Sequence, residues 1–328
     1  MNQSEPFPVT SASDLPARDE RFRWLVEDLW PMEGVGIIGG AAKSFKTWLA
    51  LDLAVSLASK TACLGVFQAN SKRRVMVYAA EDSLPDIRLR LKSICQPRGI
   101  CLSDLDLGII TVNQMHLNKP HDFLRLKATL SMHQPALLIL DPFVRLHTAI
   151  DENSAAEVSA ILGKLRGLQR EFKMAIALVH HARKNRAGLR PGQALRGSTD
   201  FHAWTDVTLY MQCRSHHLEL NVEHRTAVSP EPFLLKLADV DDCPHLKIIS
   251  QSPEKSFLPD QKNNGNLKSQ LLDVMTQNKQ PLSQVKLRQI VKARNQTVGQ
   301  TLIDLENEGL AKRTDNGWIH GRVETLDR

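Results

Sequence analysis

The chain has 328 residues, of which 42% are hydrophobic and 24% are charged, and it carries a formal net charge of +6. This balance is typical of a soluble globular protein, and we find neither an apolar run long enough to cross a bilayer nor a signal-peptide core. Five scattered cysteines without a C-x-x-C pair disfavour a disulfide framework or a zinc site, so we expect a cytoplasmic protein that contacts no membrane.

The order of apolar runs predicts an α/β fold. Residues 1–20, with three prolines, are expected to form a flexible tail, and residues 21–250 one large domain. In that domain short apolar runs alternate with helical patterns, which is typical of a doubly wound, mostly parallel sheet. Strands are predicted at 34–40, 73–80, 107–113, 136–141 and 174–181, helices at 46–59, 83–95, 121–133 and 153–172, and closing β-hairpins at 206–213, 217–222 and 232–237.

The segment GGAAKSFKTW, residues 39–48, lies between a predicted strand and a predicted helix. It is close to the phosphate-binding pattern G-x-x-x-x-G-K-[ST], in which free N–H groups at a helix start hold phosphates. Lys46 would bind the β- and γ-phosphates of ATP and Thr47 would bind Mg²⁺. Phe45 replaces the second glycine, and we expect its side chain to point away from the phosphates. The candidate ATP contacts are Gly39, Gly40, Ala41, Ala42, Lys43, Ser44, Phe45, Lys46, Thr47 and Trp48; the alternative is a glycine turn before a core helix.

Carboxylates follow two of the predicted strands. Asp141 ends the run 136–141, where a Walker B aspartate would contact the water shell of Mg²⁺. Glu81 and Asp82 follow the run 73–80, and ligands gather at the carboxyl ends of parallel strands. Glu81 is therefore expected to face Lys46 and to deprotonate the water that attacks the γ-phosphate. A solvated acidic turn or a helix cap remains the alternative.

These motifs resemble those of RecA/DnaB-type ATPases, in particular the branch with plasmid RepA-type hexameric helicases and AAA_25 ATPases. This branch has loops of the form G-x-x-K-S-[GFY]-K-[ST], so Phe45 fits the family pattern. The resemblance continues in YAAEDS, LILDP, LVHHARK, LRGSTDF and ELNVEHR and covers roughly residues 20–240. It implies a RecA-like fold that hydrolyses ATP with Mg²⁺, with Glu81 as the catalytic glutamate and Asp141 as the metal-associated aspartate.

The resemblance implies further roles. His181 falls where the superfamily has a Gln or His that senses the γ-phosphate, and His180 is a neighbour that could exchange roles with it. Arg225 matches an arginine finger that acts on ATP in a neighbouring subunit, which implies a homo-oligomer, by family expectation a hexameric ring. Many relatives have Lys two residues before this arginine, whereas this chain has Glu223.

The basic segment 183–198, which contains no acidic residue, matches in position the loops that contact single-stranded DNA in related rings. A solvated basic loop is the alternative. The candidate DNA contacts in this segment are Arg183, Lys184, Arg186, Arg190 and Arg196.

The C-terminal part follows a linker predicted at residues 251–266, which are rich in Pro, Gly, Asn and charge. Residues 267–328 contain three helical patterns and a short strand, and they resemble a small winged-helix domain. The basic residues around the second helix suit phosphates, whereas acidic residues at the end of the third leave protein contact or simple packing as the alternative. The candidate DNA contacts here are Lys286, Arg288, Lys292 and Arg294.

The sequence therefore predicts an ATP-hydrolysing, DNA-binding motor, a RepA-like helicase or helicase-like ATPase of a plasmid, phage or mobile element. Its partners would be single-stranded or duplex DNA, further copies of the chain, and a replication or recombination protein. The alternative is a non-translocating ATP-dependent regulator of transposition, recombination or defence. A scaffold that binds nucleotide without hydrolysis is disfavoured, because the four residues proposed for turnover are all present: Lys46, Thr47, Glu81 and Asp141.

Overall fold

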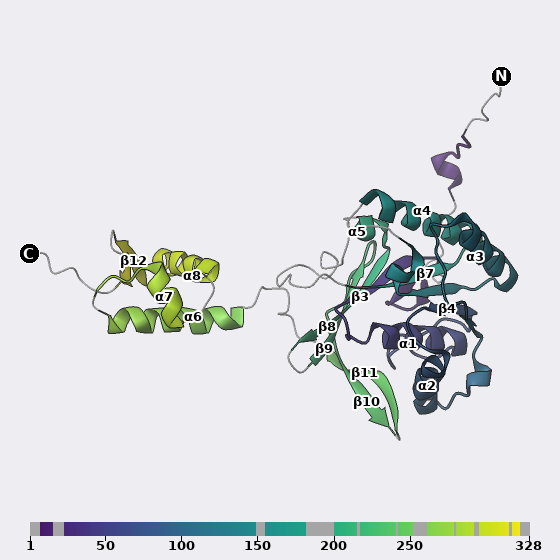
Figure 1. Ribbon diagram of the computed structural model, residues 1–328, viewed down its shortest axis with the longest axis horizontal. Helices are drawn as coiled ribbons and strands as arrows, with labels where there is room; N and C mark the ends of the chain where they lie inside the picture. Colours follow the sequence, from purple (N-terminus) through teal and green to yellow (C-terminus); the bar gives the residue numbers. More distant parts are fainter. Residues whose placement is uncertain are drawn as a thin grey trace, which may run out of the picture. The chain divides into compact units, whose positions relative to one another are not determined.

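A computed structural model of the chain describes residues 7–15, 23–148, 155–181, 200–214, 217–240, 242–251, 261–278, 280–291, 295–314 and 317–321. The chain divides into two compact units, Met1–Ser256 and Phe257–Arg328 (Figure 1). Within the predicted N-terminal tail, residues 7–15 are exposed and contain one 3₁₀ turn, Ala12–Asp14. Among the described residues no helix combines the length and the hydrophobicity that a membrane span requires.

A nine-stranded sheet, in the order β11-β10-β9-β8-β3-β7-β6-β4-β5, forms the centre of the first unit. Six neighbouring strands are parallel: β8 (Val207–Arg214), β3 (Val35–Gly40), β7 (Ala175–His181), β6 (Leu137–Asp141), β4 (Val75–Ala79) and β5 (Leu107–Ile110). The sheet continues with antiparallel β9 (His217–His224), β10 (Phe233–Val240) and β11 (Cys243–Gln251). The predicted doubly wound, mostly parallel sheet with closing hairpins is confirmed, and β11 is an additional strand.

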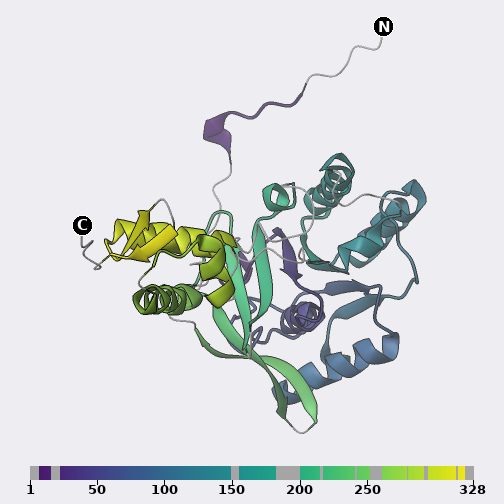
Figure 2. The same cartoon turned by 60° about the vertical axis from the view of Figure 1, so that its left-hand side comes forward.

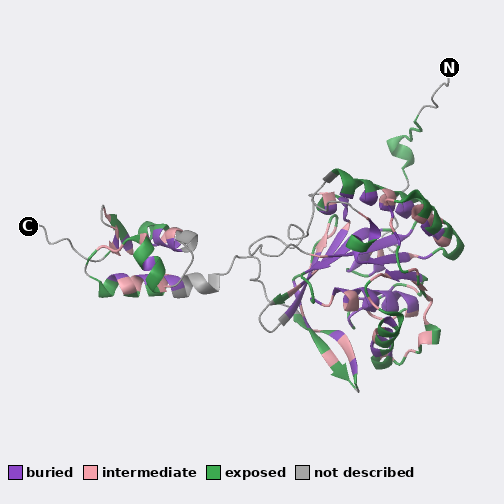
Figure 3. Cartoon of the chain, in the orientation of Figure 1, coloured by how far each residue is buried: buried purple, intermediate pink, exposed green. Residues whose placement is uncertain are grey.

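Helices cover both faces of this sheet (Figures 1 and 2). The helices α1 (Lys46–Ser59) and α2 (Leu84–Cys95) contribute to one apolar cluster. The helices α3 (Pro120–His133), α4 (Ala155–Phe172) and α5 (Asp200–Trp204) contribute to the other. Successive strand residues point to opposite faces, so Ile38 belongs to the first cluster and Ile37 to the second. The central strands β3, β7, β6 and β4 are accordingly buried along nearly their whole length, whereas β5 and β10 are partly exposed and most helices are buried on one face (Figure 3).

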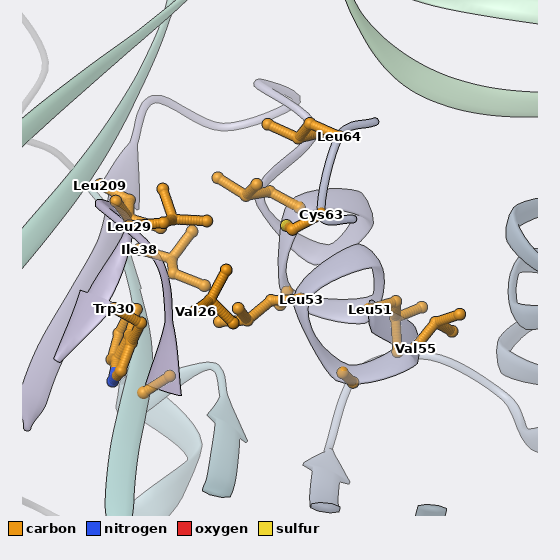
Figure 4. Close-up of a cluster of buried hydrophobic side chains, with 14 of the residues drawn as sticks. Val26, Leu29, Trp30, Ile38, Leu51, Leu53, Val55, Cys63, Leu64 and Leu209 are labelled. Atoms are coloured by element: carbon orange, nitrogen blue, oxygen red, sulfur yellow. The ribbon is translucent and has the colours of Figure 1, made fainter. Parts of the chain in front are cut away.

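The helix α1 is an exception, because it is buried almost all round. A short sheet that was not predicted, β1 (Trp24–Val26) with β2 (Trp30–Pro31), contributes Val26 and Trp30 to the same cluster as Leu53 of this helix. Figure 4 shows Val26, Leu53 and Cys63 within this cluster. Because α1 is enclosed on several sides, its N-terminus has a fixed position at the end of β3.

In the described residues of the second unit there are three helices, α6 (Gln261–Gln277), α7 (Gln284–Val291) and α8 (Asn295–Asn307). A two-stranded sheet follows, β12 (Ala311–Thr314) and β13 (Gly317–His320), and Leu282 forms a bridge to Trp318. The unit has its own core, which includes Leu271, Leu287 and Leu302. The helix α6 begins at Gln261, so part of the segment predicted as a linker is helical.

Candidate functional site

The loop between β3 and α1 turns sharply. Gly40 has φ of +153°, and a Cβ atom there would lie 2.3 Å from the Met211 carbonyl oxygen and 2.6 Å from Ser44 Oγ, so only glycine fits. Lys43 and Phe45 have φ of 61° and 62°. Left-handed conformations are costly for residues with a Cβ, by about 1–3 kcal/mol each. The loop is therefore a strained turn that the enclosed helix holds in place.

Phe45 occupies the N-cap position of α1, and its side chain makes no capping hydrogen bond. The N–H groups in the first turn of the helix are thus not occupied by a cap, which is the arrangement that binds phosphate. The Phe45 side chain is half-buried: it packs against the apolar cluster around α1 and also lines the cavity beside the loop.

A cavity of about 340 Å³ lies beside this loop, at the carboxyl ends of the parallel strands. It brings together Lys46, Thr47, Glu81, Asp141 and His181, which the sequence analysis had assigned to one site. The other lining residues are Lys43, Ser44, Phe45, Trp48, Ala79, Asp82, Arg90 and Val179.

Lys46 and Asp141 are buried, Thr47 is half-buried, and all three form hydrogen bonds at the start of α1. Lys46 Nζ donates to the Ala41 carbonyl at 2.7 Å, so its ammonium group contacts the loop that would hold the phosphates. Burial lowers the pKa of Lys46, while the charges of Asp141 and Glu81 oppose that change. Thr47 Oγ1 donates to Asp141 Oδ2 at 2.7 Å, which joins α1 to the end of β6.

Asp141 is a carboxylate in a poorly solvated position. Its exposed fraction is 8%, and burial is the main reason that its pKa is raised to about 6. The hydrogen bond from Thr47 and the charge of Lys46 oppose the increase, and Asp82 and Glu81 add to it. A hydroxyl and a carboxylate are the hard oxygen ligands that Mg²⁺ prefers, and a cation would stabilise the buried charge. Thr47 and Asp141 therefore fit a Mg²⁺ site.

Glu81 and Asp82, which follow β4, each pair with an arginine. Arg145 Nε donates to Glu81 Oε1 at 3.0 Å, and the Arg90 guanidinium pairs with Asp82. Arg90 also lies over the Trp48 ring, with Cζ 5.8 Å from the ring centroid. Arg90 lies in the run IRLRL that follows YAAEDS, but the sequence assigns it no role, and the distant pairing of β4 with β6 is needed to place Arg145.

The two histidines that end β7 point to opposite faces of the sheet. His181 lines the cavity, next to the loop that follows Gly40. His180 is 1% exposed and stacks on Phe201, with ring centroids 4.4 Å apart. The hypothesis that the two could exchange roles is therefore wrong, because strand alternation places His180 in the core.

Arg225 lies far from the cavity of its own chain. It directly follows β9, whose His224 pairs with Val207, and Val207 pairs with Gly36 at the opposite end of β3 from the loop. The Arg225 backbone N–H donates to the Asp206 carbonyl at 2.9 Å, and its side chain is 3.8 Å from the Asp206 carboxylate. Arg225 could thus act on ATP only in another copy of the chain.

Few of the candidate DNA contacts fall within the described part of the chain. Lys286 and Arg288 are exposed on α7. The other seven lie outside the described residues: Arg183, Lys184, Arg186, Arg190, Arg196, Lys292 and Arg294.

A family model and two solved structures match this chain. The profile of the AAA_25 family, an AAA domain, matches residues 2–187, more than half of the chain. The ATPase domain of G40P aligns with 67% of this chain and 86% of its own, with 14% identity and a TM-score of 0.48. The RadB recombinase aligns with 65% and 90% of the two chains, with 15% identity and a TM-score of 0.47. No curated protein matches the sequence significantly.

The family match includes the phosphate-binding loop, both carboxylate-bearing strand ends and His181. The loop after β3 lies at the carboxyl ends of the parallel strands, where doubly wound sheets bind their ligands. This chain belongs to the AAA_25 family and is a RecA-like P-loop ATPase.

Proposed function

We propose that the chain is an ATP-hydrolysing DNA motor of the RepA-like helicase type. One observation carries the ATPase part of the proposal: Lys46, Thr47, Glu81 and Asp141 line a single cavity at the start of α1. Nucleotide binding, metal binding and water activation each have a residue of suitable chemistry there.

In the proposed reaction, Lys46 and the first N–H groups of α1 bind the phosphates of ATP. Glu81 orients the attacking water and accepts its proton, which is the role of a general base. Mg²⁺, when bound by Thr47 and Asp141 with the nucleotide, supplies positive charge against the β- and γ-phosphates. His181 is proposed to sense the γ-phosphate, because it ends the strand beside the loop and lines the same cavity.

DNA binding is supported by charge. The two described candidates, Lys286 and Arg288, are exposed on α7, and neither forms a salt bridge within the described residues. Lysine and arginine side chains placed in this way can bind phosphates through counterion release.

The second unit is proposed to be a winged helix, because three helices followed by a two-stranded sheet form the order expected of that domain. Two acidic residues at the end of α8 already have partners inside the unit. Lys268 Nζ donates to Glu308 Oε1 at 2.5 Å, and the Arg313 N–H donates to Glu306 Oε1 at 3.4 Å. Since Lys268 offsets the charge of Glu308 and a backbone N–H occupies Glu306, these carboxylates argue less strongly against a DNA-binding face on α7.

An oligomer is proposed because Arg225 cannot reach its own cavity. A ring would place the Arg225 of one copy at the ATP of the next, and a hexamer is the family expectation. Many relatives have a lysine two residues before the arginine, but this chain has Glu223 there. Its neighbour would therefore receive one cation, Arg225, in place of two.

The competing proposal is a regulator that hydrolyses ATP without moving along DNA. The test is ATP hydrolysis with and without single-stranded DNA, measured beside strand displacement on a forked duplex. Stimulated hydrolysis with unwinding is the result expected of the motor. Hydrolysis without unwinding would favour the regulator, and the absence of any DNA effect would contradict the nucleic-acid proposal.

A further inference from the structure

Glu81, the proposed general base, accepts a hydrogen bond from an exposed arginine, Arg145. We propose that Arg145 restrains Glu81, and that the phosphate backbone of single-stranded DNA releases it by binding Arg145. This inference rests on the proposed function, in which Glu81 is the general base.

The restraint is a direct contact between two neighbouring strand ends. Arg145 Nε donates to Glu81 Oε1 at 3.0 Å. Arg145 belongs to a 3₁₀ turn, Phe143–Leu146, that follows β6, and Glu81 follows β4, which is hydrogen-bonded to β6. Phe143 and Leu146 are fully buried, so the turn is anchored while the Arg145 side chain extends toward solvent. A guanidinium that occupies one oxygen fixes the direction of the carboxylate and competes with water for it.

The contact is exposed enough to be broken. The exposed fractions of the Arg145 and Glu81 side chains are 60% and 45%. Exposed ion pairs of this kind are weak, and their loss changes an equilibrium by only about two- to fivefold. Phosphate oxygens accept two parallel N–H bonds from arginine, so a DNA phosphate can replace the carboxylate.

The neighbouring ion pair between Asp82 and Arg90 is less accessible to an anion from solution. Its side chains are only 22% and 26% exposed, and Arg90 is also held over the Trp48 ring. Of the two arginines paired with the acidic residues after β4, Arg145 is therefore the one available to an anion from solution.

The experiment measures steady-state ATP hydrolysis at saturating ATP, with and without oligothymidylate, for wild type and Arg145→Ala. We expect the variant to raise the DNA-free rate about two- to fivefold and to lose most of the DNA stimulation, with an unchanged KM for ATP. Arg145→Lys should lie between the two, because it keeps a cation but loses the planar fork.

Arg74→Ala is the matched control. Arg74 pairs with Asp106 at 2.8 Å, with exposed fractions of 49% and 40%, and it immediately precedes β4 at the other end of that strand. Its loss should leave both rates unchanged. The double variant Arg145→Ala/Glu81→Gln should be as slow as Glu81→Gln, because the restraint acts through Glu81.

Each contrary result has a definite meaning. An unchanged or lower DNA-free rate in Arg145→Ala would overturn the restraint, and a raised rate with full DNA stimulation would overturn release by DNA. Acceleration in the double variant would show that Arg145 does not act through Glu81. These results concern the inference alone; a wild-type protein that does not hydrolyse ATP would contradict the proposed function itself.

Discussion

The ends of β6 and β4 carry the two carboxylates proposed for metal binding and catalysis, and their environments are opposite. Asp141 is buried and linked to Thr47, whereas Glu81 is nearly half exposed and linked to Arg145. A buried carboxylate with a short hydrogen bond has little freedom to move, which suits a permanent ligand of a metal ion. A carboxylate at the solvent edge can change its partner, which suits a group that must receive a proton at one step of a cycle. Substitutions of Asp141 and of Glu81 are therefore expected to have different effects.

The largest effect is expected at Lys46, whose charge interacts with both carboxylates. Lys46→Ala should abolish measurable nucleotide binding or turnover, because a buried cation that faces the phosphates is removed. Binding of a fluorescent ATP analogue and phosphate release check this directly. The matched control is Lys43→Ala, because Lys43 lines the same loop but is exposed and should matter much less.

Asp141 should control how stability depends on pH. The folded-state pKa of Asp141, about 6, lies above its value in the unfolded chain. The stabilising contribution of this group to the folded state is therefore fully present below about pH 4 and is lost as pH rises through about 6. The full difference is about 3 kcal/mol in the free energy of unfolding, of which about 1 kcal/mol falls between about pH 7.5 and pH 5.

Asp141→Asn, which keeps an oxygen to accept the Thr47 hydrogen bond, should remove this part of the pH dependence. Denaturation midpoints of nucleotide-free protein in EDTA, at the two pH values, measure the difference between wild type and variant. An identical pH dependence in the two proteins would show that Asp141 does not titrate in this range.

The smallest effect is expected at Phe45. Phe45→Gly should bind ATP about as well as wild type, and its stability should change by no more than about 1 kcal/mol, because relief of the left-handed φ offsets the lost apolar contact. The larger loss that a fully buried phenylalanine would cause is not expected, since Phe45 is half-buried. Titration with an ATP analogue and thermal denaturation give both quantities; a large gain in affinity would mean that the side chain obstructs the phosphates.

Much of the ATPase unit could be predicted because its signals are local. An apolar run, a glycine turn and an apolar helical pattern stand next to one another in the sequence. Together they predict β3, the loop and the whole of α1. Asp141 and Glu81 could be assigned to one crevice because parallel strands present their carboxyl ends at the same edge of the sheet.

The features that were missed depend on contacts between distant residues. The pairing of Arg145 with Glu81 spans 64 positions of sequence, and no periodicity encodes it. The sheet of β1 and β2 is too short to produce a pattern. The choice between His180 and His181 needed the register of β7, since a shift of one residue exchanges the faces.

The most direct test of the central claim compares nucleotide binding with turnover in Glu81→Gln. If Glu81 activates water at the exposed strand end while Lys46, Thr47 and Asp141 hold nucleotide and metal, the variant should bind ATP with nearly wild-type affinity. Its rate of hydrolysis should fall by about 10²–10⁴-fold, the usual contribution of a general base. Hydrolysis at the wild-type rate in Glu81→Gln would contradict the assignment of the base and, with it, the division of roles between the two strand ends.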